Sequence, residues 1–170
     1  MAHAAEAERR AKIRPATTPA DLVRFAALVR EYVESLPFPL DFQDVDQELA
    51  CLGHEYGPPG GCVLLADLEG EAVGCVAIRP LEPPAIAELK RMYLQPRARG
   101  WGIGRALAAA ALERAGQLGY ERVRLDTVAE MVEAAAVYMA LGFYEIEPYT
   151  YNPLPTARFY ETRLPAPGPA

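Results

Sequence analysis

The segment LQPRARGWGIGRAL, residues 94–107, constrains the fold most, because it places three glycines within five residues between a strand-like and a helix-like stretch. Glycine lets backbone N–H groups approach a ligand closely, and the first amides of a helix have no partner within the helix. Those amides also form the positive end of the helix dipole, which favours an anion. Glycine at a helix start lowers the stability of the helix, a cost that is explained if a ligand binds the bare backbone. The segment therefore predicts a strand–loop–helix unit that binds phosphate.

Two well-known glycine loops do not match this segment. A P-loop has lysine and then serine or threonine after its last glycine, whereas Gly104 is followed by Arg105 and Ala106. A dinucleotide-binding fingerprint has a further glycine three residues after its second one, and Arg105 holds that place after Gly102. One alternative stays open, in which the glycines only make a tight connection and the arginines are solvated surface.

The spacing of apolar residues predicts the elements around the loop. Thr18 is typical of a helix N-cap, with Pro19 at the first helical position and the acid Asp21 at the third, the spacing of a capping box. Asp44 and Gln47 have the same spacing. In chain order we expect strand 12–16, helix 19–36, helix 44–52, strands 62–66, 72–78 and 86–94, helix 102–118, strand 123–127, helix 131–141, and strands 143–149 and 157–164. That order predicts an α/β fold with a mixed sheet.

Composition narrows the class of protein. A chain of 170 residues, 51% of them hydrophobic, suits one folded domain. Three cysteines at wide spacings argue against a disulfide framework, and with only two histidines, His3 and His54, we expect neither a metal site nor a serine–histidine–aspartate triad. No apolar run has the length of a membrane span, and residues 1–12 lack the apolar stretch of a secretory signal. We therefore expect a cytoplasmic protein without a membrane partner.

Charge is distributed unevenly along the chain. The formal net charge of −6 argues against nucleic acid as a partner. Between Leu89 and Leu112, however, there is no acidic residue, and the cations of this stretch are Lys90, Arg91, Arg97, Arg99 and Arg105. A positive stretch within an acidic chain predicts a small polyanionic ligand.

The sequence Arg99-Gly-Trp-Gly102-Ile-Gly104 resembles the Arg-x-x-Gly-x-Gly pattern of the GNAT (N-acetyltransferase) superfamily. The preceding residues 88–94, ELKRMYL, resemble that superfamily's fourth strand, and residues 134–143, AAAVYMALGF, resemble its second signature. The resemblance runs over residues 12–164. It implies a single GNAT-like acyl-CoA acyltransferase domain over residues 12–164, with a mixed, mostly antiparallel central sheet flanked by helices. Flexible tails are expected at residues 1–11 and 165–170.

The resemblance also implies how acetyl-coenzyme A would bind. The pyrophosphate would lie on the loop, the pantetheine arm beside the fourth strand, and the thioester between that strand and the fifth, near Thr127. Many relatives carry Asn early in the last helix where this chain has Met131, which puts that contact with the coenzyme in doubt. The implied coenzyme-binding residues are Met92, Tyr93, Leu94, Arg99, Gly100, Trp101, Gly102, Ile103, Gly104, Arg105, Ala106, Thr127, Met131, Ala134 and Tyr138.

The implied reaction is direct attack of an amine on the thioester. Tyr138 matches the signature tyrosine and is the candidate acid for the leaving thiolate, whereas without the motif it reads as a core tyrosine. Glu88 is the candidate base, and strand alternation places it on one face with Lys90, Met92 and Leu94. An ordinary surface carboxylate is the alternative reading for Glu88.

The acceptor would be a small-molecule or peptide amine, and the resemblance also allows a homodimer. The acidic residues Asp41, Asp44, Asp46 and Glu48 suit either a cationic amine or a solvated helix face. Tyr144, Tyr149 and Tyr151 suit either an acceptor pocket or packing. Two other functions stay open: a catalytically silent coenzyme-A-binding sensor and a nucleotide-binding domain.

Overall fold

The computed structural model describes residues 11–40 and 44–165. A seven-stranded sheet has the order β1-β2-β3-β4-β5-β7-β6, and every neighbouring pair is antiparallel except β4 and β5. The strands are β1 (Ala11–Pro15), β2 (Cys62–Leu68), β3 (Glu71–Glu82), β4 (Ile86–Leu94), β5 (Arg122–Val128), β6 (Tyr144–Ile146) and β7 (Ala157–Arg163). The predicted mixed, mostly antiparallel sheet is confirmed. β1 begins within the predicted N-terminal tail, and the rest of the two predicted tails, apart from Pro165, lies outside the described residues.

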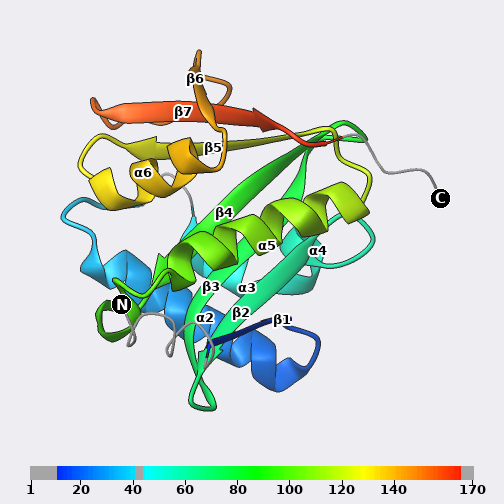
Figure 1. The fold of residues 1–170 in the computed structure, drawn as a ribbon, viewed down its shortest axis with the longest axis vertical. Coiled ribbons are helices and arrows are strands. Elements are labelled where there is room, and N and C mark those ends of the chain that lie inside the picture. Colours follow the sequence, from blue (N-terminus) through cyan, green and yellow to red (C-terminus); the bar gives the residue numbers. More distant parts are fainter. Residues whose placement is uncertain (1–10, 41–43, 166–170) are drawn as a thin grey trace.

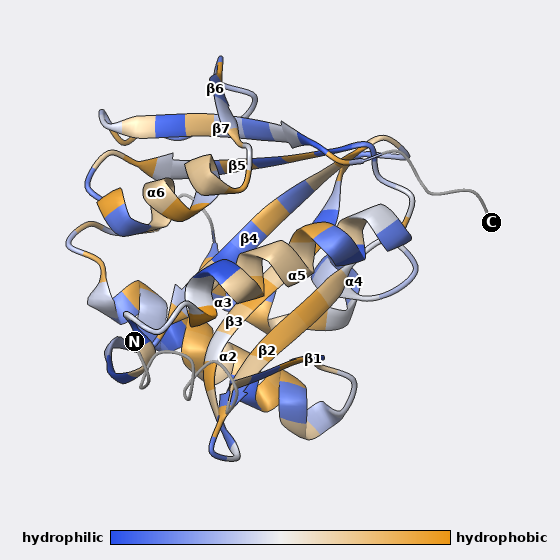
Figure 2. Ribbon diagram, in the orientation of Figure 1, coloured by the Kyte–Doolittle hydropathy of each residue, from blue (hydrophilic) through white to orange (hydrophobic). Residues whose placement is uncertain are grey.

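Helices cover both faces of the sheet (Figure 1). They are α2 (Pro19–Ser35), α3 (Val45–Ala50), α4 (Leu52–Tyr56), the short 3-10 helix η2 (Pro96–Ala98), α5 (Ile103–Gln117) and α6 (Val132–Ala140). One buried cluster joins α5 and α6 to the sheet and a second joins α2 and α4 to the other face. β2 is hydrophobic along most of its length because both of its faces are covered (Figure 2).

Two predicted elements differ from the structure. The helix predicted over residues 44–52 is two short helices that meet at Cys51, and Asp44 makes no side-chain cap because its backbone is left-handed, with φ of 47°. The predicted Asp44–Gln47 capping box is therefore wrong. The strand predicted over residues 143–149 is only β6, which ends two residues before Pro148, a residue that has no amide hydrogen to donate to a neighbouring strand.

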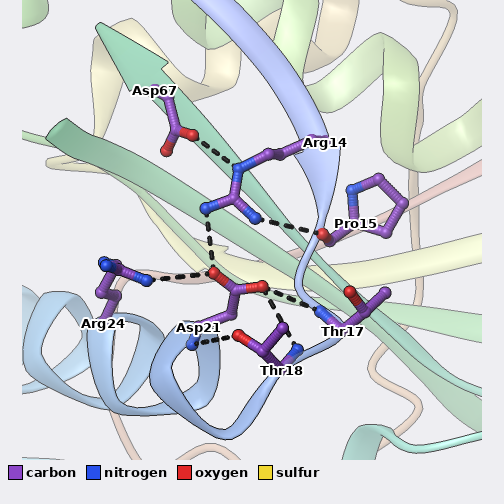
Figure 3. A network of polar contacts seen from close by, with 7 residues as sticks. All are labelled: Arg14, Pro15, Thr17, Thr18, Asp21, Arg24 and Asp67. Carbon is purple, nitrogen blue, oxygen red and sulfur yellow. Dashed lines mark hydrogen bonds and ion pairs between the residues drawn. The ribbon is translucent and has the colours of Figure 1, made fainter. Parts of the chain in front are cut away.

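The start of α2 is fixed to the sheet by a polar network (Figure 3). Thr18 and Asp21 form the predicted capping box, in which the Asp21 amide donates to the Thr18 hydroxyl over 3.1 Å. Arg14 on β1 donates to Asp21 over 2.9 Å and to Asp67 on β2 over 2.5 Å. Arg24 also pairs with the Asp21 carboxylate, at 3.2 Å. Arg14 thus links the start of α2 to two strands, through Asp21 and Asp67.

We expect Asp21→Asn to lower the free energy of unfolding at neutral pH and to make that free energy depend less on pH under acidic conditions. The Arg14 guanidinium holds the pKa of Asp21 well below its usual value. Because folding lowers this pKa, the stabilisation is complete above about pH 4 and is lost as the pH falls toward the lowered pKa. The difference in urea-unfolding free energy between wild type and variant should therefore shrink as the pH falls below about 4. Glu113→Gln, at an exposed carboxylate on α5, is the matched control.

Among the described residues, no helix combines the length and the apolar character needed to cross a membrane.

Candidate active site between β4 and β5

β4 and β5 pair only over a short stretch and then separate. Their parallel register joins residues 86–88 to residues 122–124, although β4 continues to Leu94 and β5 to Val128. Figure 1 shows the two strands meeting near the end of α5 and diverging toward α6. The edge of β4 that faces β5 therefore carries backbone groups without a strand partner beyond residue 88.

A β-bulge at Arg91 changes which side chains of β4 share a face. Cys75 on β3 pairs with Tyr93 and Ala77 pairs with Lys90, so β4 has one extra residue there, and Arg91 has a φ of 57°. Leu89 before the bulge and Met92 after it both belong to the core beneath α5. The predicted common face of Glu88, Lys90, Met92 and Leu94 is therefore wrong, because the extra residue reverses the alternation.

A cavity passes through the opening between the strands. Its walls come from β4, β5, α6, α2 and two loops, so it reaches both faces of the sheet. The lining residues are Tyr32, Phe38, Leu40, Leu89, Lys90, Arg91, Met92, Leu125, Asp126, Thr127, Val128, Met131, Ala134, Tyr138, Asn152 and Leu154. Five predicted site residues meet here, namely Met92, Thr127, Met131, Ala134 and Tyr138. Tyr93 and Leu94 do not line it.

Tyr138 presents a hydroxyl group without a hydrogen-bond partner among the described residues. Its side chain is 5% exposed, and its ring packs against Phe143 with the ring centroids 5.5 Å apart. Burial raises the pKa of Tyr138 above its ordinary value, and the nearby Tyr32 and Asp126 act in the same direction. The hydroxyl group thus keeps its proton at neutral pH and can donate it as a hydrogen bond within the cavity.

Glu88 is held by other protein groups and does not line the cavity. It is 2% exposed, and its Oε1 accepts a hydrogen bond from Arg79 Nε at 2.9 Å and forms an ion pair with Arg79 Nη2 at 2.8 Å. Its Oε2 accepts from the Tyr149 hydroxyl at 2.6 Å. With both oxygens occupied, this carboxylate links β4 to β3 and to the loop that carries Tyr149. The geometry therefore gives no support to the prediction that Glu88 is the base.

The glycine loop exposes the amides of Ile103, Gly104 and Arg105 at the start of α5. Gly100 and Gly102 have φ values of 82° and 79°, the left-handed region that glycine adopts without strain. No side chain caps the helix at Gly102, so its first amides have no acceptor among the described residues. A diphosphate is an acceptor of suitable charge for this position.

Two other predicted loop amides are already used. The Arg99 amide donates to the Pro96 carbonyl at 3.2 Å, and the Ala106 amide donates to the Gly102 carbonyl at 3.1 Å. Arg99 Nε also donates to the Leu94 carbonyl at 2.9 Å, which fastens the loop to the end of β4. Trp101 is half-buried and packs against the core beside α5. The backbone amides that remain free to bind a phosphate are therefore fewer than the predicted residues 99–106 would supply. We call the free amides of Ile103, Gly104 and Arg105 the phosphate cradle.

Met92 connects this cradle to the cavity. A Cβ atom at Gly104 would lie 3.8 Å from Met92 Cε and 3.8 Å from Leu94 Cδ2. Met92 also lines the cavity. The loop amides, the free edge of β4 and the opening beside Tyr138 thus form one continuous path, along which a long ligand with a phosphate at one end fits.

Sequence reasoning missed several cavity residues on the α2 side of the sheet. Lys90 and Asp126 come from β4 and β5, Tyr32 from α2, and Asn152 from the loop before β7. Because of the bulge, Lys90 and Met92 lie on opposite faces of β4 and not on one face, and no local pattern marks Asn152. Asp41, Asp44, Asp46 and Glu48, the acidic residues considered for binding a cationic amine, do not line the cavity in the described part of the chain. Glu48 is buried and pairs with Arg91 at 2.7 Å, and Asp41 lies outside the described residues.

The three tyrosines near the last hairpin do not line the cavity. Tyr149 bonds to Glu88, Tyr144 donates to Glu161 at 2.5 Å, and Tyr151 is 75% exposed. Across residues 11–40 and 44–165, no three His, Cys, Asp or Glu side chains are grouped so that they could hold a metal ion.

Comparison with known proteins places the chain among N-acetyltransferases. The model of the Acetyltransferase (GNAT) family matches residues 25–143. The chain is 41% identical over 147 residues to an uncharacterized N-acetyltransferase of Schizosaccharomyces pombe, covering 86% of this chain and 90% of that protein. It is 38% identical over 116 residues to human N-acetylaspartate synthetase, covering 68% of this chain but only 36% of that enzyme.

A solved structure has the same fold. The N-acetyltransferase PaiA of Thermoplasma acidophilum, in complex with coenzyme A, superposes with a TM-score of 0.69 at 16% identity. The match covers 90% of this chain and 98% of that one.

Proposed function

The chain belongs to the GNAT acetyltransferase family, and from that premise we propose that it transfers the acetyl group of acetyl-coenzyme A to an amine. The observation that carries the proposal is the continuous path from the bare α5 amides, along the free edge of β4, to the cavity at Tyr138. A phosphate cradle alone would suit many nucleotides. Its connection to a cavity between splayed strands suits a long thioester.

The amides of Ile103, Gly104 and Arg105 would hold the diphosphate, and the free edge of β4 at Met92–Leu94 would bond the pantetheine arm as an added strand does. Thr127, Met131 and Ala134 line the cavity where the arm would end. Acetyl-coenzyme A supplies the activated acetyl group.

Tyr138 is the proposed hydrogen-bond donor to the leaving sulfur, which takes up the proton released by the amine by way of solvent. Transfer forms a C–N bond, breaks a C–S bond, removes one proton from the amine and adds one to the sulfur. A thiol has a pKa of about 8.5, whereas Tyr138 holds its proton far above that. Its O–H group can therefore stabilise the departing thiolate by a hydrogen bond at any working pH. No described residue accepts a hydrogen bond from this hydroxyl group, so the donor is available within the cavity.

An alkyl ammonium has a pKa of about 10, so about one molecule in a thousand is neutral at pH 7. The amine must lose a proton before it attacks, and with both oxygens of Glu88 held by Arg79 and Tyr149, we assign this step to solvent water in the cavity. Similarity to N-acetylaspartate synthetase supports amino acids as one acceptor class to test.

We expect release of free thiol when the protein is mixed with acetyl-coenzyme A and an amine acceptor from a panel of amino acids, polyamines, aminoglycosides and peptides. Mass spectrometry should find one acetylated amine for each thiol released. Coenzyme A, but not ATP or NAD, should raise the melting temperature, since a ligand at 100 times its Kd stabilises by about 2.7 kcal/mol. Binding of the coenzyme without turnover of any acceptor would identify a silent coenzyme-binding domain instead.

A further inference from the structure

Lys90 is a cavity-lining cation without a bonded counterion. Its ammonium group forms no hydrogen bond or ion pair with any described residue, although the side chain is half-buried. Neighbouring cations on the same part of the sheet are all paired: Arg79 with Glu88, Arg91 with Glu48, and Arg124 with Glu161. Because a buried charge is unfavourable without a partner, this position is suited to an anion that arrives with the substrate.

Burial lowers the pKa of Lys90, while the nearby carboxylates of Glu88 and Asp126 favour its charged form. Arg79 and Arg91 oppose that charge, and both are themselves paired. A bound carboxylate would add to the groups that keep Lys90 protonated.

Asp126 lines the same cavity from the opposite strand. Leu125 beside it packs beneath α5, so Asp126 points to the α2 side, and the same alternation places Lys90 there beside Leu89. Its Oδ2 accepts a hydrogen bond from Asn152 Nδ2 at 3.0 Å, whereas its Oδ1 has no bonded partner and no cation pairs with it among the described residues. The splayed strands thus present one cation and one anion to a single ligand.

We propose that the acceptor is an amino acid, a molecule with a carboxylate beside its amine, and that Lys90 binds the carboxylate while Asp126 accepts a hydrogen bond from the amine. This inference rests on the proposed acetyl transfer and concerns recognition alone. The apolar side chains of Phe38, Leu40 and Leu154 line the same cavity, and their low polarity strengthens both contacts. Opposite charges at the two contacts set the direction in which the acceptor lies.

The test compares an amino acid with its own carboxamide, which keeps the amine and the side chain but lacks the carboxylate charge. We expect wild type to prefer the amino acid by about tenfold or more in kcat/KM, the range of a charge-assisted hydrogen bond. Lys90→Gln should remove that preference by raising KM for the amino acid and should leave the carboxamide unchanged. Lys90→Arg should retain much of it.

Two further measurements separate recognition from folding and from catalysis. Lys12, the only other lysine, is exposed on β1, so Lys12→Gln is the matched control and should behave as wild type. In the presence of coenzyme A, calorimetry should give a Kd for the N-acetyl amino acid that is about tenfold higher for Lys90→Gln than for wild type. The melting temperature of the variant should be unchanged.

The failures of the two proposals differ. If no acceptor is acetylated, the proposed function fails. If amines without a carboxylate are acetylated equally well, or if Lys90→Gln slows the amino acid and its carboxamide alike, acetyl transfer stands and the carboxylate site is overturned.

Discussion

Tyr138→Phe is expected to lower kcat for acetyl transfer by about a hundredfold, because positioned acid groups typically contribute about 10² to 10⁴ in rate. The substitution removes one oxygen that bonds to no described protein group and keeps the ring that packs against Phe143. Melting temperature and coenzyme A affinity should therefore stay at their wild-type values. Single-turnover thiol release, together with calorimetry of coenzyme binding, measures both effects.

The control for this variant is Tyr151→Phe, which removes a hydroxyl group from a tyrosine that is 75% exposed and does not line the cavity. It should leave kcat unchanged. A Tyr138→Phe enzyme with full activity would show that the departing sulfur needs no hydrogen bond from Tyr138, which would then be a core residue only.

Gly104→Asp is expected to weaken coenzyme A binding by about a hundredfold or more. A carboxylate in the first turn of α5 interacts favourably with the helix dipole, so the fold should persist. The same charge would repel a diphosphate on the neighbouring amides, by up to about 4 kcal/mol for unit charges about 4 Å apart near a protein surface. Calorimetric titration with coenzyme A gives the Kd.

Gly104→Ala is the matched control at the same position. Its Cβ atom would meet Leu94 and Met92 at ordinary contact distances of 3.8 Å, so the fold accommodates it. Alanine favours a helix over glycine by about 0.5 to 1 kcal/mol, and this variant should be slightly more stable than wild type. Equal coenzyme affinity for Gly104→Asp and Gly104→Ala would mean that the phosphates lie away from the start of α5.

Elements with local causes could be predicted from the sequence. The Thr18–Asp21 capping box was recognised from spacing, and β4 has the bounds predicted for it because its apolar residues end before Pro96. The glycine loop was recognised because left-handed φ values at Gly100 and Gly102 restrict those positions to few residue types. Asp44 shows the limit of such reasoning, because a capping-box spacing has no effect when the backbone is left-handed.

The candidate site was only partly predictable. Tyr138 could be placed from its signature, but the unpaired state of its hydroxyl group depends on the α6–sheet packing around it. The role predicted for Glu88 loses support because Tyr149, 61 residues away in the chain, occupies its second oxygen. Lys90 could be predicted only as one cation of a positive stretch, and a period-two pattern does not reveal that a bulge at Arg91 turns Met92 to the other face.

By itself the sequence determined the order of most strands and helices, the capped start of α2 and the bare amides that begin α5, because each depends on residues within a few positions of one another. Only the tertiary structure decided that β4 and β5 separate after three paired residues, that Arg91 forms a bulge, and that Lys90 and Asp126 meet in one cavity. The physical reason is that strand pairing and the counterion of a buried charge are set by distant segments, which no local pattern encodes.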